Sequence, residues 1–413
     1  MNLQTMGEKA QIASRQLAQL TTHQKNQVLR SMAQALEDNT ENIVAANQVD
    51  LEQANGLKAS FVDRLTLDRA RIVGMADGLR QLAMLADPIG DTVDAWTTET
   101  GLEIAKRRVP LGVIGMIFEA RPNVSVDASG LCFKSGNAVI LRGGKEALQT
   151  NQMLVKVLRR VLDDHDLDSN AIQLIDDPSH EVANQFMQLT EYLDVLIPRG
   201  SARLINAVAQ QATVPVIKTG AGNCHIYVDD DADLEMAINV VVNAKVQRPS
   251  VCNAAEKLLI NSAVASEYLP AIAQALIEQN VELRGDKRAQ AILGDQVIPA
   301  TSEDWDTEYN DYIMAIKVVD TLDEAISHIN QHNTQHSEAI ITNNYEHSQR
   351  FLAEVDAAAV YVNASTRFTD GSEFGFGAEI GISTQKLHAR GPMGLNELTT
   401  TKYVIRGNGQ VRK

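Results

Sequence analysis

The sequence predicts an α/β protein with two parallel-sheet domains and a separate pair of β-strands. Short apolar runs alternate with helical patterns from Val113 to Val228, and the alternation resumes from Lys257 to Val362. Such alternation is typical of a parallel sheet that helices cover on both faces. The length of 413 residues also exceeds the usual size of one domain, which favours two or three.

The composition narrows the class of partner. Hydrophobic residues make up 44% of the chain and aromatic residues only 4%, so aliphatic side chains must fill the cores. The net charge of −16 argues against nucleic acid, because a phosphate backbone requires a basic face. A small anionic substrate is still compatible, since it needs only a local positive pocket.

The three cysteines, Cys132, Cys224 and Cys252, predict a reducing compartment without a disulfide framework. They show no metal-ligand spacing, so we expect no metal site. The sequence has neither a basic-then-apolar leader nor a long apolar run. We therefore expect a soluble cytoplasmic protein with no membrane segment.

The first 88 residues read as helical scaffold without chemistry. Thr22 is the expected N-cap of a helix whose apolar residues recur at helical spacing, and Pro88 ends the last helix of the region. Asn55-Gly56 predicts a turn between helices.

Two β-rich stretches lie outside the α/β alternation. Leu102 to Val109 alternates apolar and polar residues, and Thr399 to Ile405 is rich in β-formers before a Gly-Asn-Gly turn. The two strands are expected to pair, either as an oligomerisation flap or as an ordinary edge hairpin. The sequence leaves both interpretations open.

The first α/β run is expected to form one parallel sheet. Its predicted strands are 113–118, 138–141, 172–175, 195–197, 214–217 and 225–228, and its helices are 124–134, 147–162, 182–189 and 201–210. Such sheets bind ligands at the carboxyl ends of their strands.

Four of those strand ends carry a cation beside glycine, serine or asparagine. The cations are Arg121, Arg142, Arg199 and Lys218. Exposed backbone amides and cations at one sheet edge favour a phosphate-bearing ligand, although loops are commonly basic and Gly-rich. No Gly-x-Gly-x-x-Gly or Walker-type motif follows a strand, so a standard Rossmann or P-loop mode is unsupported.

The second α/β run begins beside a cysteine. Its predicted strands are 257–260, 312–318, 339–342 and 359–362, and its helices are 263–278, 322–330 and 345–353. Cys252 lies in the polar segment Gln247 to Glu256, between a helical run and a strand, where a thiol is exposed and aimed. Cys252 is therefore a candidate nucleophile in a cleft between domains, although most cysteines are small core residues.

Several stretches along nearly the whole chain carry a family resemblance. They are 109–115 (VPLGVIG), 118–124 (FEARPNV), 134–138 (KSGNA), 197–201 (IPRGS), 252–256 (CNAAE) and 388–395 (HARGPMGL). On these motifs the chain closely resembles the aldehyde dehydrogenase superfamily. Within it, the chain resembles the branch that reduces L-glutamyl 5-phosphate to L-glutamate 5-semialdehyde in proline biosynthesis.

The resemblance implies an aldehyde-dehydrogenase-like fold. It implies a cofactor-binding domain over 1–96 and 111–228, and a catalytic domain over 229–366. It further implies a crossing segment over 367–397 and an oligomerisation flap made of 97–110 and 398–413.

The resemblance also implies site residues and NADPH as cofactor. Cys252 matches the nucleophile, and Asn123 matches the amide that stabilises the oxyanion. Four residues match positions that bind the cofactor: Arg142, expected at the 2′-phosphate, Gly200, Ser201 and Glu308. Arg121, Arg199 and Lys218 are candidates for binding the substrate's phosphate and α-carboxylate, and each is equally compatible with a solvated loop cation.

One departure from the superfamily concerns water. Hydrolytic members carry a glutamate general base where this chain has Lys218, so activated water is missing here. That agrees with an acyl-phosphate reductase acting through a Cys252 thioester. The alternatives are a water-using aldehyde dehydrogenase and a non-catalytic relative. The resemblance also implies a homo-oligomer and makes the upstream glutamate 5-kinase a candidate partner.

Overall fold

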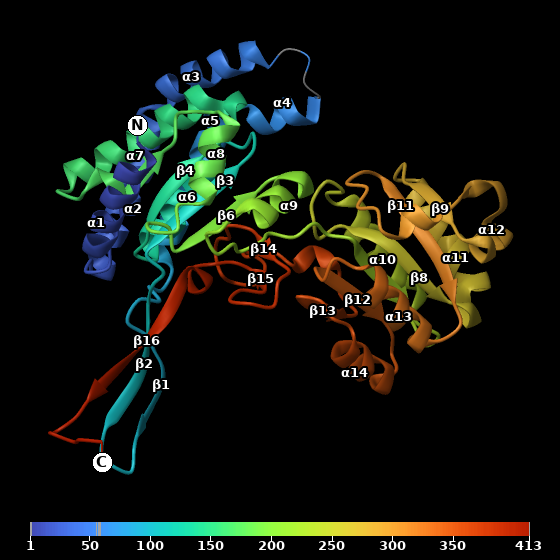
Figure 1. Cartoon of the computed structure of the whole chain (residues 1–413). Helices are drawn as coiled ribbons and strands as arrows, with labels where there is room; N and C mark the ends of the chain where they lie inside the picture. The colour runs from blue at the N-terminus through green and yellow to red at the C-terminus, as the bar shows by residue number, and fades with distance from the viewer. Residues whose placement is uncertain (1, 55, 57–58, 413) are drawn as a thin grey trace. The chain divides into compact units, whose positions relative to one another are not determined.

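The computed structural model describes residues 2–54, 56 and 59–412. The chain forms two compact units (Figure 1). Unit 1 comprises Met1–Thr219, Gly375–Gly381 and Met393–Lys413, and unit 2 comprises Gly220–Phe374 and Ile382–Pro392. Among the described residues, no helix is long and apolar enough to cross a membrane.

Unit 1 begins with a helical layer, as the periodicity predicts. Its helices are α1 (Leu3–Leu17), α2 (Thr22–Asp38), α3 (Thr40–Gln53), α4 (Ala59–Leu65) and α5 (Arg69–Met84). The N-cap of α2 is Thr21 rather than Thr22, because the Thr21 side chain accepts from the backbone N–H of Gln24 and forms a capping box with it. The predicted Asn55-Gly56 turn includes Asn55, which lies outside the described residues.

The sheet of unit 1 is parallel, with strand order β5-β4-β3-β6. The strands are β3 (Val113–Phe118), β4 (Ala138–Arg142), β5 (Ile172–Leu174) and β6 (Val195–Arg199). Four α-helices follow them: α6 (Asn123–Lys134), α7 (Leu148–Asp164), α8 (His180–Met187) and α9 (Ala202–Gln211). Side chains of α1 and α8 pack with β3, β4 and β6 in one apolar core.

Two predicted strands of this sheet are wrong. Residues 214–217 form only a single parallel bridge, between Val216 and Leu196. The stretch predicted at 225–228 is strand β7 (Cys224–Val228), which belongs to the sheet of unit 2. An apolar run shows that a strand is buried, but it does not show which of two parallel sheets buries it.

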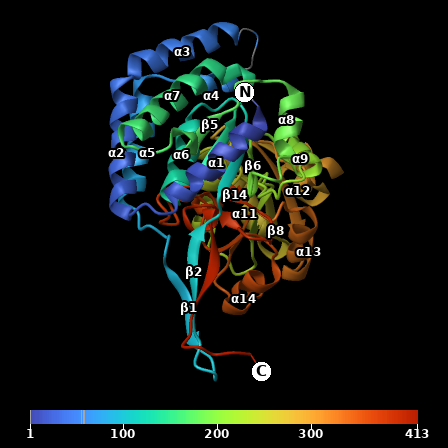
Figure 2. The ribbon, with the colours of Figure 1, turned by 60° about the vertical axis from the view of Figure 1, so that its left-hand side comes forward.

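The flap of unit 1 is a three-stranded antiparallel sheet with the order β1-β2-β16 (Figure 2). Strands β2 (Glu103–Pro110) and β16 (Thr399–Arg406) pair as predicted, with Thr399 opposite Pro110. The third strand, β1 (Thr92–Thr97), was missed, and five of its six residues, 92–96, were assigned to the cofactor-binding domain. All six residues of β1 are exposed, so burial gives no periodic signal there.

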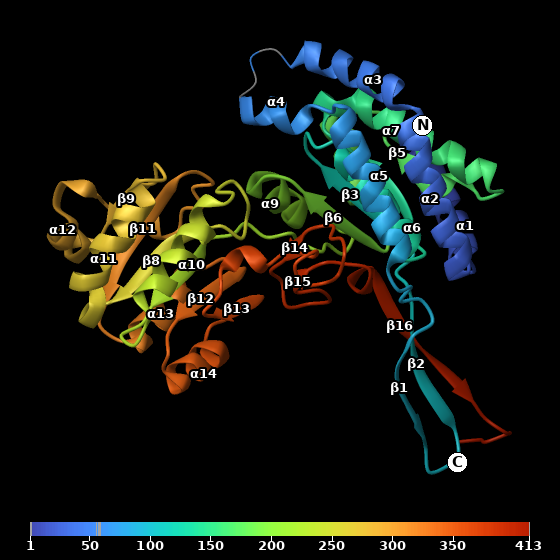
Figure 3. The same ribbon diagram turned by 180° about the vertical axis from the view of Figure 1, so that it is seen from behind.

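Unit 2 contains a seven-stranded parallel sheet with the order β10-β9-β11-β8-β7-β12-β13. Its strands are β7, β8 (Ala255–Asn261), β9 (Glu282–Gly285), β10 (Ile298–Pro299), β11 (Ile313–Val319), β12 (Ser337–Ile341) and β13 (Ala359–Val362). One core joins the sheet to α10 (Leu234–Val246), α11 (Ser262–Ile277) and α12 (Lys287–Leu293). A second core joins it to α13 (Leu322–His332) and α14 (Tyr345–Glu354), so helices cover both faces (Figure 3).

The segment after β13 contributes residues to both units in turn. It forms the short helix η5 (Thr366–Phe368) and then the hairpin of β14 (Ile382–Ser383) and β15 (Gly391–Pro392). The chain changes units after Phe374, Gly381 and Pro392, in the stretch predicted as a crossing segment.

Candidate functional site

Cys252 lies in the turn that joins α10 to β8 in unit 2. Of the three cysteines it alone is partly exposed, while Cys132 and Cys224 are buried. Burial raises the pKa of both buried thiols, which disfavours their thiolate forms. The structure therefore leaves Cys252 as the thiol that a reagent or substrate can reach.

The backbone of Cys252 is fixed by the loop that precedes β7. A Cβ atom added at Gly222 would lie 1.3 Å from the carbonyl oxygen of Cys252, so only glycine permits this approach. The Cys224 thiol donates to the same oxygen, with 3.2 Å between Sγ and O. The loop before β7 and the first residue of that strand thus both contact the peptide that carries the reactive thiol.

Asn253, the residue after Cys252, is hydrogen-bonded to the segment that follows β13. Its Nδ2 donates to the carbonyl oxygen of Thr369 at 2.9 Å, and the Thr366 hydroxyl donates to the carbonyl oxygen of Asn253 at 2.7 Å. Asn253 and Thr366 are both buried. The turn is consequently tied to two separate parts of unit 2, which limits the movement of Cys252.

The structure brings Glu308 to the same loop. One Glu308 carboxylate oxygen accepts from the backbone N–H of Gly222 at 2.7 Å. Strand β8 fixes the residues around Glu308: the side chain of Lys257 donates to the carbonyl oxygen of Thr307 at 2.7 Å. Glu256 accepts from the backbone N–H of Asn310 at 3.1 Å. Two of the predicted site residues, Cys252 and Glu308, are thus linked through Gly222.

Buried charges support this turn. Lys245 and Glu256 form a fully buried ion pair with 2.8 Å between Nζ and Oε2. Burial raises the pKa of Glu256 to about 7, although Lys245 opposes the shift, and burial lowers the pKa of Lys257 to about 8. All three side chains are fully buried, so their role is to fix the loop residues that they contact.

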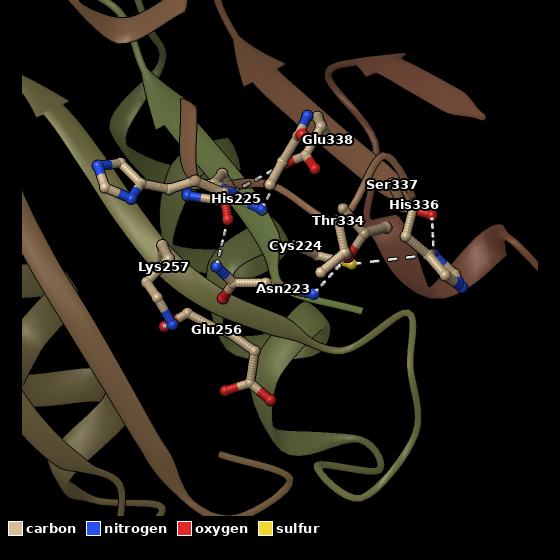
Figure 4. Close-up of polar contacts among 12 residues, drawn as sticks. Asn223, Cys224, His225, Glu256, Lys257, Thr334, His336, Ser337 and Glu338 are labelled. Atoms are coloured by element: carbon tan, nitrogen blue, oxygen red, sulfur yellow. Dashed lines mark hydrogen bonds and ion pairs between the residues drawn. The ribbon is translucent and has the colours of Figure 1, made fainter. Parts of the chain in front are cut away.

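A second polar cluster surrounds the first residues of β7 (Figure 4). His225 Nδ1 lies 3.1 Å from Glu338 Oε2, and burial favours the neutral form of both side chains. His336 Nδ1 lies 2.8 Å from the Ser337 hydroxyl and 4.0 Å from Cys224 Sγ. Burial lowers the pKa of His336 to about 4. The cluster connects the start of β12 with the thiol that contacts the Cys252 backbone.

The strand register of unit 1 brings its predicted cations to one sheet edge. Ile117 lies opposite Arg142, and Phe118 lies opposite Arg199. Arg121 lies three residues after the end of β3 and is half-buried. Lys218 is exposed and follows the bridge between Val216 and Leu196. Of the four strand ends predicted to cluster, those of β3, β4 and β6 lie at one edge of the sheet, whereas the stretch before Lys218 is not a strand.

A carboxylate already occupies the first turn of α9. Glu119 accepts from the backbone N–H of Ser201 at 2.7 Å and from its hydroxyl at 2.8 Å. A Cβ at Gly200 would lie 2.6 Å from the same carboxylate. Where the sequence predicts a phosphate of the cofactor, the start of the helix donates to a carboxylate of the protein itself. Sequence reasoning assigned no role to Glu119, although it directly follows β3.

Arg142 and Asn123 each have a protein partner in unit 1. The Arg142 guanidinium donates to the carbonyl oxygens of Pro178 at 2.8 Å and Ser179 at 3.3 Å. Its Nε is buried and has no hydrogen-bond partner among the described residues. Asn123 Nδ2 donates to Asp127 at 2.8 Å, and burial raises the pKa of Asp127 to about 6. Asn123 therefore begins α6 with its amide oriented by a residue one turn later.

Comparison with known proteins shows the family. The model of the aldehyde dehydrogenase family matches residues 2–304 and 296–404. The chain is 66% identical over 413 residues to the gamma-glutamyl phosphate reductase of Ligilactobacillus salivarius, with 100% of each chain covered. It is 59% identical over 408 residues to the enzyme of the same name from Clostridium botulinum, with 98% of each covered.

Solved structures of related enzymes share the fold of this chain. The crystal structure of gamma-glutamyl phosphate reductase from Thermotoga maritima matches with a TM-score of 0.98 at 48% identity and covers 100% of both chains. An acetylating aldehyde dehydrogenase from Geobacillus thermoglucosidasius shares the fold with a TM-score of 0.70 at 15% identity, covering 99% of this chain and 97% of that one. The chain therefore belongs to the aldehyde dehydrogenase family, and within it groups with the relatives named gamma-glutamyl phosphate reductase.

Proposed function

We propose that the chain reduces L-glutamyl 5-phosphate to L-glutamate 5-semialdehyde and phosphate, the second step of proline biosynthesis from glutamate. The observation that carries the proposal is the partly exposed Cys252, held by fixed backbone contacts. The chain that contains it is 66% identical over its full length to a relative named for this reduction. The three free cysteines favour the reducing cytoplasm as its location.

The proposed chemistry begins at the Cys252 sulfur. The thiolate attacks the γ-carbonyl carbon, a C–S bond forms, and phosphate leaves with the electrons of the C–O bond. NADPH, when bound, supplies the hydride that reduces the resulting thioester. Asn123 is the proposed donor to the oxyanion, which collapses to the aldehyde and regenerates the Cys252 thiolate. Arg121, Arg199 and Lys218 remain the proposed cations for the phosphate and the α-carboxylate.

The residues proposed for NADPH fit a phosphate-bearing cofactor. The buried Arg142 Nε has no hydrogen-bond partner among the described residues, which suits an added anionic oxygen. Gly200 and Ser201 form a helix start whose donors now bind the carboxylate of Glu119, so a phosphate there would displace that side chain. Glu308 is the proposed partner of the nicotinamide ribose. The preference for NADP over NAD rests on Arg142.

We further propose that the flap joins copies of the chain into a homo-oligomer. The flap exposes large apolar side chains on a three-stranded sheet, with Tyr403 59% and Ile405 57% exposed. Such exposure is typical of surfaces that another chain covers. Glutamate 5-kinase remains the proposed partner upstream, because it would supply an acyl phosphate that water readily hydrolyses.

The proposal is tested in the reverse direction. Glutamate semialdehyde and NADP should yield NADPH only when inorganic phosphate or arsenate is present, because no glutamate stands at position 218 to activate water. Lys218→Glu should raise the phosphate-independent rate and depress the phosphate-dependent rate. Cys252→Ala should abolish turnover, while Cys132→Ala, which changes a buried thiol in α6, should keep the chemistry.

Sustained full-rate turnover of the unmodified protein without phosphate would restore the water-using alternative. An active Cys252→Ala variant would overturn the thioester.

A further inference from the structure

Arg367 lies in η5, the helix that anchors the residue after Cys252. Its carbonyl oxygen accepts from Asn253 Nδ2 at 3.3 Å, and its Nε donates to Gln247 Oε1 at 2.7 Å. Gln247 caps the end of α10, five residues before Cys252 in the chain. Both the backbone and the side chain of Arg367 are thus fixed to the two ends of the segment that carries the reactive thiol.

The charge of Arg367 is not neutralised by a carboxylate. Among the residues that the structure describes, no Asp or Glu oxygen lies within 4.0 Å of its guanidinium. The acidic residue closest in sequence, Asp370, accepts instead from the backbone N–H of Ser372 at 2.8 Å. Arg367 is half-buried, and a desolvated cation without a counter-charge is costly.

A second cation adds to this field. Burial lowers the pKa of Arg367, the positive charge of Arg248 lowers it further, and the charges of Asp370 and of a Cys252 thiolate act in the opposite direction. Arg248, Arg367 and the thiol are therefore close enough to interact electrostatically. Arg248 is exposed and lies four residues before Cys252 in the chain, so its charge adds to that of Arg367 near the thiol of a protein whose net charge is −16.

We infer that Arg367, assisted by Arg248, binds an anionic group of the substrate beside Cys252. The inference rests on the proposed function and adds a specificity-determining residue to it. An arginine held through Nε presents its terminal N–H groups to two oxygens of one anion, the geometry in which guanidinium binds carboxylate or phosphate. The acyl phosphate and the α-carboxylate of the proposed substrate both offer this chemistry.

The first experiment needs no substrate. Cys252 is alkylated with anionic iodoacetate and with neutral iodoacetamide, and the labelled peptide is identified by mass spectrometry. The rate constant for iodoacetate divided by that for iodoacetamide should fall about 10-fold in Arg367→Gln, because the variant loses attraction for the anionic reagent only. A changed thiolate fraction alters both rates equally and cancels in the ratio.

The controls separate charge from structure. Arg288→Gln removes an arginine of α12 that is paired with Asp320, and it should leave the ratio unchanged. Arg367→Lys keeps the positive charge and should retain most of the ratio. This variant tests the role of the charge even if Arg367→Gln folds poorly. An unchanged ratio in a folded Arg367→Gln protein would overturn the inference, as would an equal fall in Arg288→Gln.

The second experiment identifies the anion. In the reverse reaction, Arg367→Gln should raise the KM for either inorganic phosphate or the semialdehyde by about 10- to 100-fold. A rise confined to phosphate assigns Arg367 to the leaving group, and a rise confined to the aldehyde assigns it to the α-carboxylate. Unchanged KM values for both refute the role. If the unmodified protein shows no turnover, the proposed function fails while the alkylation ratio still tests Arg367.

Discussion

The contact between Gly222 and Cys252 gives the sharpest test of how the thiol is positioned. In Gly222→Ala, the new Cβ would lie 1.3 Å from the Cys252 carbonyl oxygen, whereas ordinary contact begins at 3.4 Å. One of the two loops must therefore move by about 2 Å, because the obstructing atom belongs to backbone. A displacement of about 1 Å at a reacting group already costs on the order of 100-fold in rate, so we expect kcat to fall by at least that factor.

The assay combines turnover with thiol reactivity. Steady-state NADPH oxidation gives kcat, iodoacetamide labelling gives the accessibility of Cys252, and thermal unfolding verifies that the variant is folded. Gly74→Ala is the matched control, since no atom lies within 4 Å of its added Cβ and it lies in α5 of unit 1. The control should keep kcat and gain about 0.5–1 kcal/mol of stability, because alanine favours a helix. Wild-type kcat and labelling in Gly222→Ala would refute the positioning role.

The remaining predictions concern the cofactor and acid stability. Arg142→Ala should weaken NADPH binding about 10- to 100-fold more than NADH binding, measured by titration with each cofactor; equal losses would show that Arg142 does not contact the 2′-phosphate. The pKa of buried His336 falls from 6.5 in the unfolded chain to about 4 in the fold, so the unfolded chain takes up the proton first and stability declines as pH drops through that window. Between pH 7 and pH 4 this proton uptake should lower the free energy of unfolding by on the order of 3 kcal/mol. His336→Gln should lack this part of the decline when both proteins are unfolded with urea at the two pH values. Equal pH dependence in both proteins would contradict the assignment.

The sequence determined the local parts of this protein. Periodicity and caps locate most helices within a few residues, because the spacing of apolar side chains reports burial directly. The alternation of Leu102 to Val109 predicted a strand, and its pairing with the stretch 399–405 is confirmed. The exposed setting of Cys252 followed from its polar neighbours between a helix and a strand, and the structure leaves it partly exposed.

The tertiary structure decided which distant residues meet. The sheet that receives β7 depends on pairing with β8 and β12, and an apolar run looks the same in either sheet. The bond of Glu119 to Ser201 spans 82 residues, and the approach of Gly222 to Cys252 joins two loops that precede different strands. Local pattern reports whether a residue is buried, whereas these contacts depend on how strands align in space. For that reason the sequence alone identifies Cys252 as the candidate nucleophile, whereas the contacts that position Cys252 are visible only in the tertiary structure.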